Sequence, residues 1–434
     1  MSKVRTALKL IRKPKWLAKV LVEKTGITFF RVKIISKNYI EKFCLDFQNI
    51  SNIVLRKKNR LRISTKDGTV LLVSPYIGVP QMMAVTNYIN CWLEGFRANR
   101  YNTLFVVPFQ NEKPENLPDN LIGKILVAPF KEPNFSFHEL VNNTHPNFVL
   151  FHNSLPSVEL AYASNLKKSQ KFLFVGDAMS RRFDDLIERR SYIDKVIVGF
   201  GGIIAVSDYI RQEWEGYGFN SNRIFVARTP VNAEMWPQHV GSKFHAEAGY
   251  FGNIYHKEID NLLEISQLVS QQISEFQLSI FGDGFPEDMA NLRTKINDMG
   301  LSEVVSLHEC VTIEKMRIIQ SKLDVLLLPR EKGEFSDAGF PNKIGEYLAS
   351  GCPTVCTNVG EISQFVAPGI QIRIVEPGNN NLFAKEVIDC LNNRDWSLKI
   401  SQQGKEFIQS YASPEIVARS FLHWRENNSE YAKI

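Results

Sequence analysis

The 434-residue sequence contains no low-complexity tract and no apolar run long enough to cross a bilayer. Its longest apolar run, VIVGFGGIIAV at residues 196–206, is interrupted by three glycines. No secretory signal peptide is recognisable, because lysines repeatedly break the apolar part of the basic N-terminal segment. These absences predict a globular protein throughout, and the length suits two domains of ordinary size.

Cysteine is scarce, and no two cysteines form a CxxC pair. Cys352 and Cys356 flank the expected start of a strand, with no histidine at ligand spacing from them. Buried reduced thiols are therefore favoured over a structural zinc site, which predicts a reducing, cytoplasmic setting and no metal site. The six cysteines are Cys44, Cys91, Cys310, Cys352, Cys356 and Cys390.

Negative charge is nearly absent from the first part of the chain. Residues 1–60 hold 16 Lys and Arg against 3 Asp and Glu, whereas the remainder holds 36 against 43. Apolar residues, Trp16 among them, alternate with these basic residues. The segment could lie peripherally on an anionic membrane surface or pack its apolar stripe on the body of the protein. Nucleic acid is not expected as a partner, because no motif of a nucleic-acid-binding fold accompanies the charge.

Short apolar runs alternate with helical stretches from about residue 69 onward. TVLLVSPYIG, NTLFVVPF, NFVLFHNS, KFLFVGD and GGIIAVSD are continuous rather than alternating, which is typical of parallel strands buried on both faces. This alternation of strands and helices is interrupted at residues 232–249, and it begins again with GYFGNI, FQLSIFGDG and LDVLLLPR. The pattern predicts two α/β halves with parallel sheets, and a ligand beyond the carboxyl ends of the strands in the cleft between them.

The stretch LPREKGEFSDAGFPNKIGEYLASG at residues 328–351 carries the strongest functional signal. A strand ends in a polar loop with Glu334 and Asp337, and a helix that bears Glu346 follows a Gly-Phe-Pro-Asn turn. The first N–H groups of a helix have no partner within it, so such a turn can receive an anion. A carboxylate one turn further in suits sugar or ribose hydroxyls, although an ordinary exposed carboxylate is the plainer alternative.

Two weaker motifs precede it. SIFGDGFPEDM is a strand, a tight glycine turn around Gly282 and a helix start. FGNIYHKEIDNLLEI places Lys257 just before a helix, where an ammonium could meet a diphosphate, although the motif alone favours a solvated lysine.

Taken in order, these motifs resemble the GT-B-fold retaining glycosyltransferases of family four, the "glycosyl transferases group 1" class. The resemblance is best over residues 199–365, from GGIIAVSDYIRQEWEGYG through FGNIYHKEIDNLLE and SIFGDG to the stretch around Glu346. It implies an α/β protein of two Rossmann-like parallel-sheet domains facing a central cleft. It also implies transfer of a sugar from a nucleotide-diphosphate sugar with retention of configuration, without a metal or another cofactor.

The resemblance assigns roles to individual residues. Glu346 matches the second of two family glutamates separated by seven residues, the one that holds the ribose hydroxyls. Ala338 stands at the first position, where the family's glutamate contacts the donor sugar, and Asp337 or Glu334 could reach the same space. The remaining donor-binding candidates are Gly78, Lys257, Gly282, Gly339, Phe340, Pro341, Asn342 and Lys343.

The first half matches the family less closely. The family often places a histidine at the end of a first-domain strand, where this sequence has Asp177, and His152 ends a neighbouring strand. Asp177, His152 and Asp337 are therefore the catalytic candidates, although a cleft-edge or capping role for His152 is the plainer alternative.

The sequence thus predicts a glycosyltransferase acting on a saccharide or lipid-linked acceptor in cell-surface polysaccharide or glycolipid synthesis. Two alternatives stay open: a nucleotide-sugar epimerase of the same fold, and a catalytically weakened sugar-nucleotide-binding subunit, which the Ala338 departure suggests. The expected divisions are a basic extension (1–65), an acceptor domain (66–235), a donor domain (245–410) and a C-terminal helix packing back on the acceptor domain (411–434).

Overall fold

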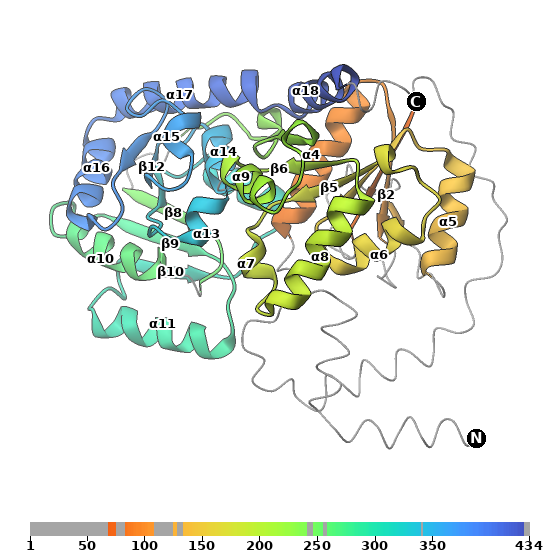
Figure 1. Ribbon diagram of the computed structural model, residues 1–434. Coiled ribbons are helices and arrows are strands. Elements are labelled where there is room, and N and C mark those ends of the chain that lie inside the picture. Colours follow the sequence, from red (N-terminus) through yellow and green to blue (C-terminus); the bar gives the residue numbers. More distant parts are fainter. Residues whose placement is uncertain are drawn as a thin grey trace, which may run out of the picture.

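The computed structural model describes residues 68–74, 83–107, 125–127, 133–240, 246–254, 258–339 and 342–428. They form two parallel sheets, one of seven strands and one of six, lying side by side in Figure 1. The predicted α/β architecture with two Rossmann-like parallel-sheet domains is confirmed. Among the described helices, none combines the length and the hydropathy that crossing a bilayer requires.

The first sheet has the order β3-β2-β1-β4-β5-β6-β7, and every paired strand in it is parallel. All five side chains of β1 are buried, which explains why its sequence is continuously apolar. The strands are β1 (Thr69–Val73), β2 (Asn102–Val107), β3 (Ile125–Val127), β4 (Phe148–His152), β5 (Lys171–Val175), β6 (Gly202–Ala205) and β7 (Ile224–Val226). The helices are α4 (Met83–Ala98), α5 (Pro133–Thr144), α6 (Leu155–Ala163), α7 (Met179–Arg182), α8 (Leu186–Gly199) and α9 (Asp208–Gly216).

The second sheet has the order β10-β9-β8-β11-β12-β13 and is also parallel. The short 3-10 helix η6 (Ala233–Met235) lies on the connection into it. The strands are β8 (Glu247–Phe251), β9 (Gln277–Phe281), β10 (Val305–His308), β11 (Val325–Leu328), β12 (Thr354–Thr357) and β13 (Arg373–Val375). The helices are α10 (Glu258–Ser270), α11 (Pro286–Asp298), α12 (Ile313–Gln320), α13 (Glu334–Ala338), α14 (Asn342–Ser350), α15 (Ile362–Phe365) and α16 (Asn380–Asn392).

Two C-terminal helices connect the domains. α17 (Arg394–Tyr411) and α18 (Pro414–Asn427) run along the top of Figure 1, from the second domain to the first. α18 packs on α4, and its Phe421 is completely buried there. The Phe421 ring centroid lies 5.3 to 6.0 Å from those of Trp92, Phe96, Phe148 and Phe172. The last described helix therefore completes the aromatic core on one face of the first sheet.

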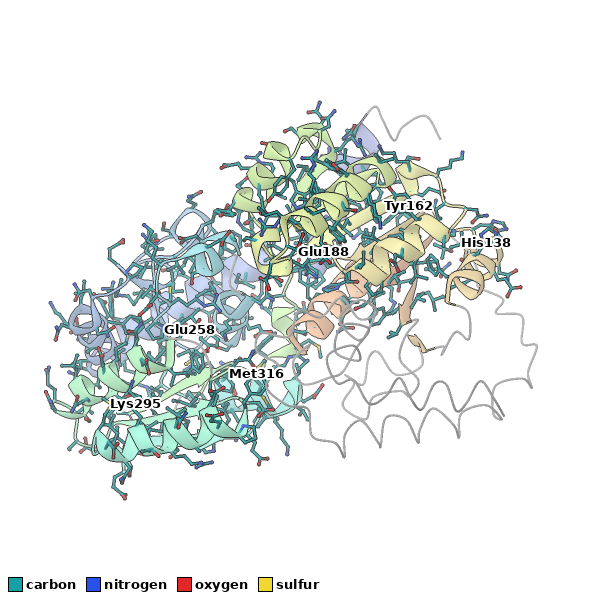
Figure 2. The ribbon with its side chains drawn as sticks, turned by 60° about the horizontal axis from the view of Figure 1, so that its bottom comes forward. His138, Tyr162, Glu188, Glu258, Lys295 and Met316 are labelled. Carbon is teal, nitrogen blue, oxygen red and sulfur yellow. The ribbon has the colours of Figure 1, made fainter. Side chains whose placement is uncertain are left out.

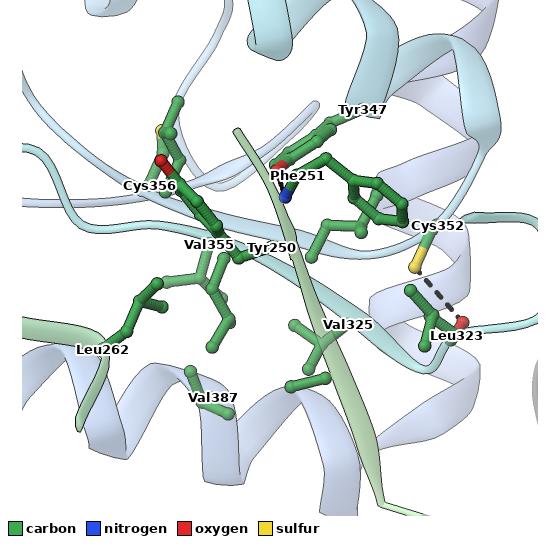
Figure 3. Packing of buried hydrophobic residues seen from close by; sticks show 14 of the residues in the cluster. Tyr250, Phe251, Leu262, Leu323, Val325, Tyr347, Cys352, Val355, Cys356 and Val387 are labelled. Atoms are coloured by element: carbon green, nitrogen blue, oxygen red, sulfur yellow. Dashed lines mark hydrogen bonds between the residues drawn. The ribbon is translucent and has the colours of Figure 1, made fainter. Parts of the chain in front are cut away.

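The core of the second domain fixes the position of α14. Tyr347 is fully buried, and its hydroxyl accepts a hydrogen bond of 3.0 Å from the backbone N–H of Phe251 at the end of β8 (Figure 3). Cys352, after the helix, donates its thiol to the carbonyl of Leu323. Of the described cysteines, four are buried as expected, but Cys310 is exposed, so the prediction was wrong for that thiol because the loop after β10 leaves it at the surface.

Candidate functional site at the domain boundary

Lys343 lies in the first turn of α14, next to the carboxyl end of β8. Its ammonium nitrogen is 5.3 Å from the centre of the Tyr250 ring, a cation–π distance. A Cβ atom added at Gly252 would come within 2.5 Å of the Lys343 Cε and Nζ atoms, so a side chain at position 252 would displace the lysine ammonium from this position. Burial lowers the pKa of Lys343 to about 8, against the carboxylates of Glu258 and Glu346, which raise it.

A buried ion pair lies beside this lysine. Arg330 follows β11 and Glu258 begins α10, and their side chains pair at 2.7 Å between Nε and Oε1. Both residues are less than 9% exposed, and the Tyr250 hydroxyl donates a 2.6 Å hydrogen bond to the other carboxylate oxygen. Since an uncompensated buried charge is costly, this network holds the ends of β8 and β11 in a fixed geometry.

Glu346 lies one turn further along α14 and faces the first domain. Its Oε1 accepts a 2.9 Å hydrogen bond from Nδ2 of Asn87 on α4, a residue 259 positions away in the sequence. Burial raises the pKa of the Glu346 carboxyl, while Asn87, Arg317 and Lys343 act in the opposite direction. The exposed-carboxylate alternative therefore does not describe Glu346, which contacts both domains.

Arg317 on α12 supplies positive charge on the same side. It is 6% exposed, and its guanidinium carbon lies 4.8 Å from the Trp236 ring centre. Met316, its neighbour on α12, lies at the boundary between the domains in Figure 2. The charges of Glu346 and of Glu94 on α4 both raise the pKa of Arg317, which burial lowers. Arg317 thus compensates acidic groups from both domains.

Ala338, at the position of the family's first glutamate, points away from any open space. It is 2% exposed and packs within the apolar core of the first domain. Its carbonyl oxygen accepts a 2.5 Å hydrogen bond from the hydroxyl of Ser207, the N-cap of α9. In this arrangement α13 closes against the first domain, and a longer side chain at position 338 would not fit.

The two carboxylates that could have replaced the missing glutamate are engaged elsewhere. Asp337 Oδ1 accepts a 3.1 Å hydrogen bond from the backbone N–H of Gly360. Glu334 accepts a hydrogen bond from Ser180 on α7, across the domain boundary. Gly360 itself has a φ of 57°, the left-handed conformation that favours glycine, so Asp337 braces a tight turn.

Further polar contacts join the two domains. Glu361, 7% exposed, accepts from the backbone N–H of Tyr209 at 3.0 Å and pairs with Arg228 at 2.8 Å. Asn342, at the start of α14, accepts a hydrogen bond from the Thr229 hydroxyl. These contacts, together with those of Ala338 and Glu346, hold the described domains in a closed arrangement.

The glycine candidates lie where backbones approach closely. A Cβ at Gly282 would come within 1.9 Å of the Gly252 carbonyl oxygen, so the loops after β8 and β9 touch there. Gly339 ends α13 with extended backbone, and its carbonyl lies beside Gly360. Four other candidates, Gly78, Lys257, Phe340 and Pro341, lie outside the described residues, as does the basic segment 1–65.

On the first-domain side, His152 and Asp177 lie at the carboxyl ends of adjacent strands β4 and β5. The His152 ring is partly exposed, and burial together with the charge of Arg182 lowers its pKa to about 3. Asp177 is exposed and lies 3.7 Å from Arg182. His152 is therefore neutral over the physiological range, whereas Asp177 is part of a charged surface pair.

The structure brings Lys343, Glu346 and Asn342 together in the first turns of α14, and Asp337 lies on α13, where it is hydrogen-bonded to the N–H of Gly360. Sequence reasoning missed Asn87, Arg317 and Glu361, whose partners are far away in the sequence. A partly buried lysine beside helix N–H groups and a carboxylate on the same helix can hold a diphosphate and a pair of hydroxyls respectively. Among the described residues, no group of three or more potential ligands is arranged around a common metal position.

Comparison with solved structures defines the class of fold. The chain is similar to a glycosyltransferase from Rickettsia africae, at 14% identity and a TM-score of 0.64, over 84% of this chain and 99% of that one. It is similar to S. aureus TarM solved with UDP and saccharide ligands, at 13% identity and a TM-score of 0.63, over 83% and 100%. It is also similar to Anabaena HepE solved with UDP-glucose, at 12% identity and a TM-score of 0.64, over 82% of this chain and 99% of that one. The protein has the GT-B fold, as predicted.

Sequence comparison points to one part of that fold. Residues 246–393, the second domain, match the family model "Glycosyl transferases group 1". A curated relative, "Uncharacterized glycosyltransferase MJ1178" from Methanocaldococcus jannaschii, is 23% identical over 213 residues. That alignment spans 48% of this chain and about half, 55%, of the relative.

Proposed function

We propose that this protein is a glycosyltransferase that moves a sugar from a nucleotide-diphosphate sugar to a saccharide or lipid-linked acceptor. The observation that carries the proposal is the placement of Lys343 and Glu346 about one turn apart on α14, within the domain that matches the family model. The relatives support it, since HepE was solved with UDP-glucose and TarM with UDP.

The roles follow from charge. Lys343 and the first N–H groups of α14 would hold the diphosphate, whose negative charge grows as the bond to the sugar breaks. We propose that these protein groups carry that charge without a metal, and that the transfer retains configuration, in keeping with the family resemblance. Asn87 donates to Oε1 of Glu346, as a ribose hydroxyl would, and we propose that the donor takes this place when the domains part to admit it.

The direct test is Glu346→Ala, with Glu346→Gln beside it. Loss of the carboxylate should weaken binding of UDP-, GDP- or ADP-sugars by about 1–3 kcal/mol, because ribose hydroxyls lose their partner. Glu275→Ala, an exposed site at the opposite end of β9, is the matched control. An unchanged dissociation constant in calorimetry would refute the ribose role.

A second candidate rests on Ala338. Because Ala338 lacks the carboxylate that the family resemblance implies, and Asp337 and Glu334 are hydrogen-bonded to Gly360 and Ser180, the chain could bind a sugar nucleotide without turning it over, as a subunit of a transferase complex. Incubation with a panel of sugar nucleotides separates the possibilities. Nucleotide release that needs an acceptor supports transfer, isomerised sugar supports an epimerase, and binding without turnover supports the subunit.

The cellular setting extends this proposal. A cytoplasmic enzyme attached peripherally to the inner face of a membrane through residues 1–60 could reach a lipid-linked acceptor of polysaccharide or glycolipid synthesis. The charge of that segment, 16 Lys and Arg against 3 Asp and Glu, supports the attachment.

A further inference from the structure

One face of α8 is buried in the first domain, and the opposite face exposes apolar side chains. Leu186, Ile187 and Val198 are 70%, 81% and 67% exposed. Isolated exposed apolar residues are ordinary, but a group of them on one helix face marks an interaction surface. The buried residues of the helix are Tyr192, Ile193 and Val196.

The exposed residues follow the spacing of a helix–helix contact. Four of them are four, three and four positions apart, which places them in one stripe along α8. The neighbouring helix α6 borders α8, and Figure 2 shows Tyr162 and Glu188 on these two helices. The stripe consists of Ile187, Ser191, Asp194 and Val198, and together with the exposed flanking residues Glu188, Arg190 and Lys195 we call it the α8 face.

We propose that the α8 face is the contact between two copies of this chain, in which the two α8 helices pack antiparallel about a two-fold axis. The axis lies near position 192, the middle of the stripe. The chain then forms a homodimer through its first domain.

The order of residues along the α8 face is complementary to itself. In a two-fold interface residue i contacts residue j of the second copy, and j contacts i, so every contact occurs twice. With the axis near position 192, Ile187 packs on Val198 of the second copy. Both ends of the stripe are apolar, so this antiparallel packing covers all of the most exposed apolar side chains of the helix.

The charges fit the same register. Arg190 comes opposite Asp194 of the second copy, and Glu188 comes opposite Lys195. Arg190 and Asp194 already pair within one helix at 2.8 Å, so the two copies would join their pairs into a network of four charges. A two-fold axis along the helices would instead set Arg190 beside Arg190, and such like-charge contacts are unfavourable.

The same charges disfavour an anionic membrane as the occupant. Asp185 caps the helix, and Glu188 and Asp194 lie on the exposed side. Carboxylates at both ends of the α8 face would be repelled by a negative surface, whereas in the dimer each carboxylate of the helix faces a cation.

The contact is small, which sets the expected strength. Stable interfaces bury roughly 1,200–2,000 Å2 in total. A pair of 14-residue helices that meet along one stripe buries less than that, so we expect a weak dimer that dissociates on dilution.

The test begins with the full chain in sedimentation velocity. Over about 5 to 200 μM, the range suited to a weak interface, the average mass should rise from monomer toward dimer. Ile187→Glu should keep the chain monomeric, and because the side chain is exposed the fold should not change. Ile370→Glu, at a 55% exposed position in the second domain, is the matched control and should behave like the wild type.

Charge reversal tests the register. Arg190→Glu alone and Asp194→Arg alone should each weaken association about tenfold or more, because like charges then face each other across the axis. In a mixture of the two variants, position 190 of each copy faces an opposite charge at position 194 of the other. The mixture should therefore recover wild-type association, with the mixed dimer identified by its mass in native mass spectrometry.

A wild-type chain that stays monomeric over this range would overturn the proposal. So would a dimer that Ile187→Glu leaves intact, or single variants whose mixture associates no better than either alone. If the monomeric chain instead binds anionic vesicles and Ile187→Glu weakens that binding, the α8 face is a membrane contact. These measurements need no sugar nucleotide, so absent sugar transfer would refute the proposed function and leave this inference standing.

Discussion

The two domains place different chemistry at the carboxyl ends of their strands. In the second domain, Glu258, Arg330 and Lys343 form a charged cluster around the ends of β8 and β11. In the first domain, β4 ends in His152, a neutral ring, and the charge after β5 is an exposed pair of Asp177 with Arg182. Positive charge is therefore partly buried only on the second domain, which is the side that the proposed function assigns to an anion.

The largest effect is expected from Ala338→Glu, which would restore the residue that the family resemblance implies. Because Ala338 is buried in the first domain's core, an unpaired carboxylate there costs roughly 3 kcal/mol or more, relieved only by parting the domains. We expect transfer activity, as kcat/KM, to fall on the order of 100-fold.

Ala290→Glu, on the exposed face of α11, controls for added charge. A gain of activity in Ala338→Glu would instead mean that position 338 faces the donor sugar.

Lys343→Met should lower kcat/KM by about 10- to 100-fold, the range of a lost charge-assisted hydrogen bond. Because the pKa of Lys343 is lowered to about 8, the protonated form is present below pH 8 and lost above it. The wild-type kcat/KM should therefore fall as the pH rises through about 8. Lys343→Arg should remove this alkaline limb.

Lys399→Met, an exposed lysine on α17, serves as the control. An alkaline limb that persists in Lys343→Arg would assign the titration to another group.

Glu361→Gln tests the contact between the domains, and its expected effect is smaller. The amide of Gln keeps one acceptor for the Tyr209 N–H but loses the negative charge opposite Arg228. We expect this loss to weaken the contact between the domains by about 1 kcal/mol, which lowers the population in which the domains are in contact by a factor of about 5. We expect a larger radius of gyration in small-angle X-ray scattering and a several-fold lower kcat/KM. Glu386→Gln breaks a similar pair with Arg373 inside the second domain and should change neither.

The smallest effect on catalysis is expected from the basic segment. Each Lys or Arg near an anionic surface contributes roughly 1 kcal/mol, which salt screens. The protein should co-sediment with anionic vesicles at low salt, and less at high salt, while turnover of a soluble acceptor stays the same. Equal binding to neutral vesicles, or none to either, would favour packing of this segment on the protein body.

The sequence predicted the fold well because continuous apolar runs have few alternatives. The run VLLL, bounded by Asp324 and Pro329, is the fully buried strand β11. The helix with Glu346 was equally readable, since its Gly-Phe-Pro-Asn turn and its glycine end mark both limits.

The partners of the site could not be predicted in the same way. Asn87 meets Glu346, and Tyr209 meets Glu361, only because the two domains lie against each other in the folded chain. Asp337 was predicted as a catalytic candidate from its nearness in sequence to Ala338. Asp337 is half-buried and accepts a hydrogen bond from the N–H of Gly360. The direction in which its side chain leaves the short helix α13 determines this contact, and the distance in sequence from Ala338 does not.

The position of α18 has a consequence for synthesis of the protein on the ribosome. The aromatic core of the first domain includes Phe421, so that domain cannot be completed until residues 414–427 have emerged. Throughout translation of the second domain, Trp92, Phe96 and Phe148 lack the ring that covers them in the finished protein. A chain cut short within α18 would keep these rings uncovered, and we expect quality-control proteases to remove it.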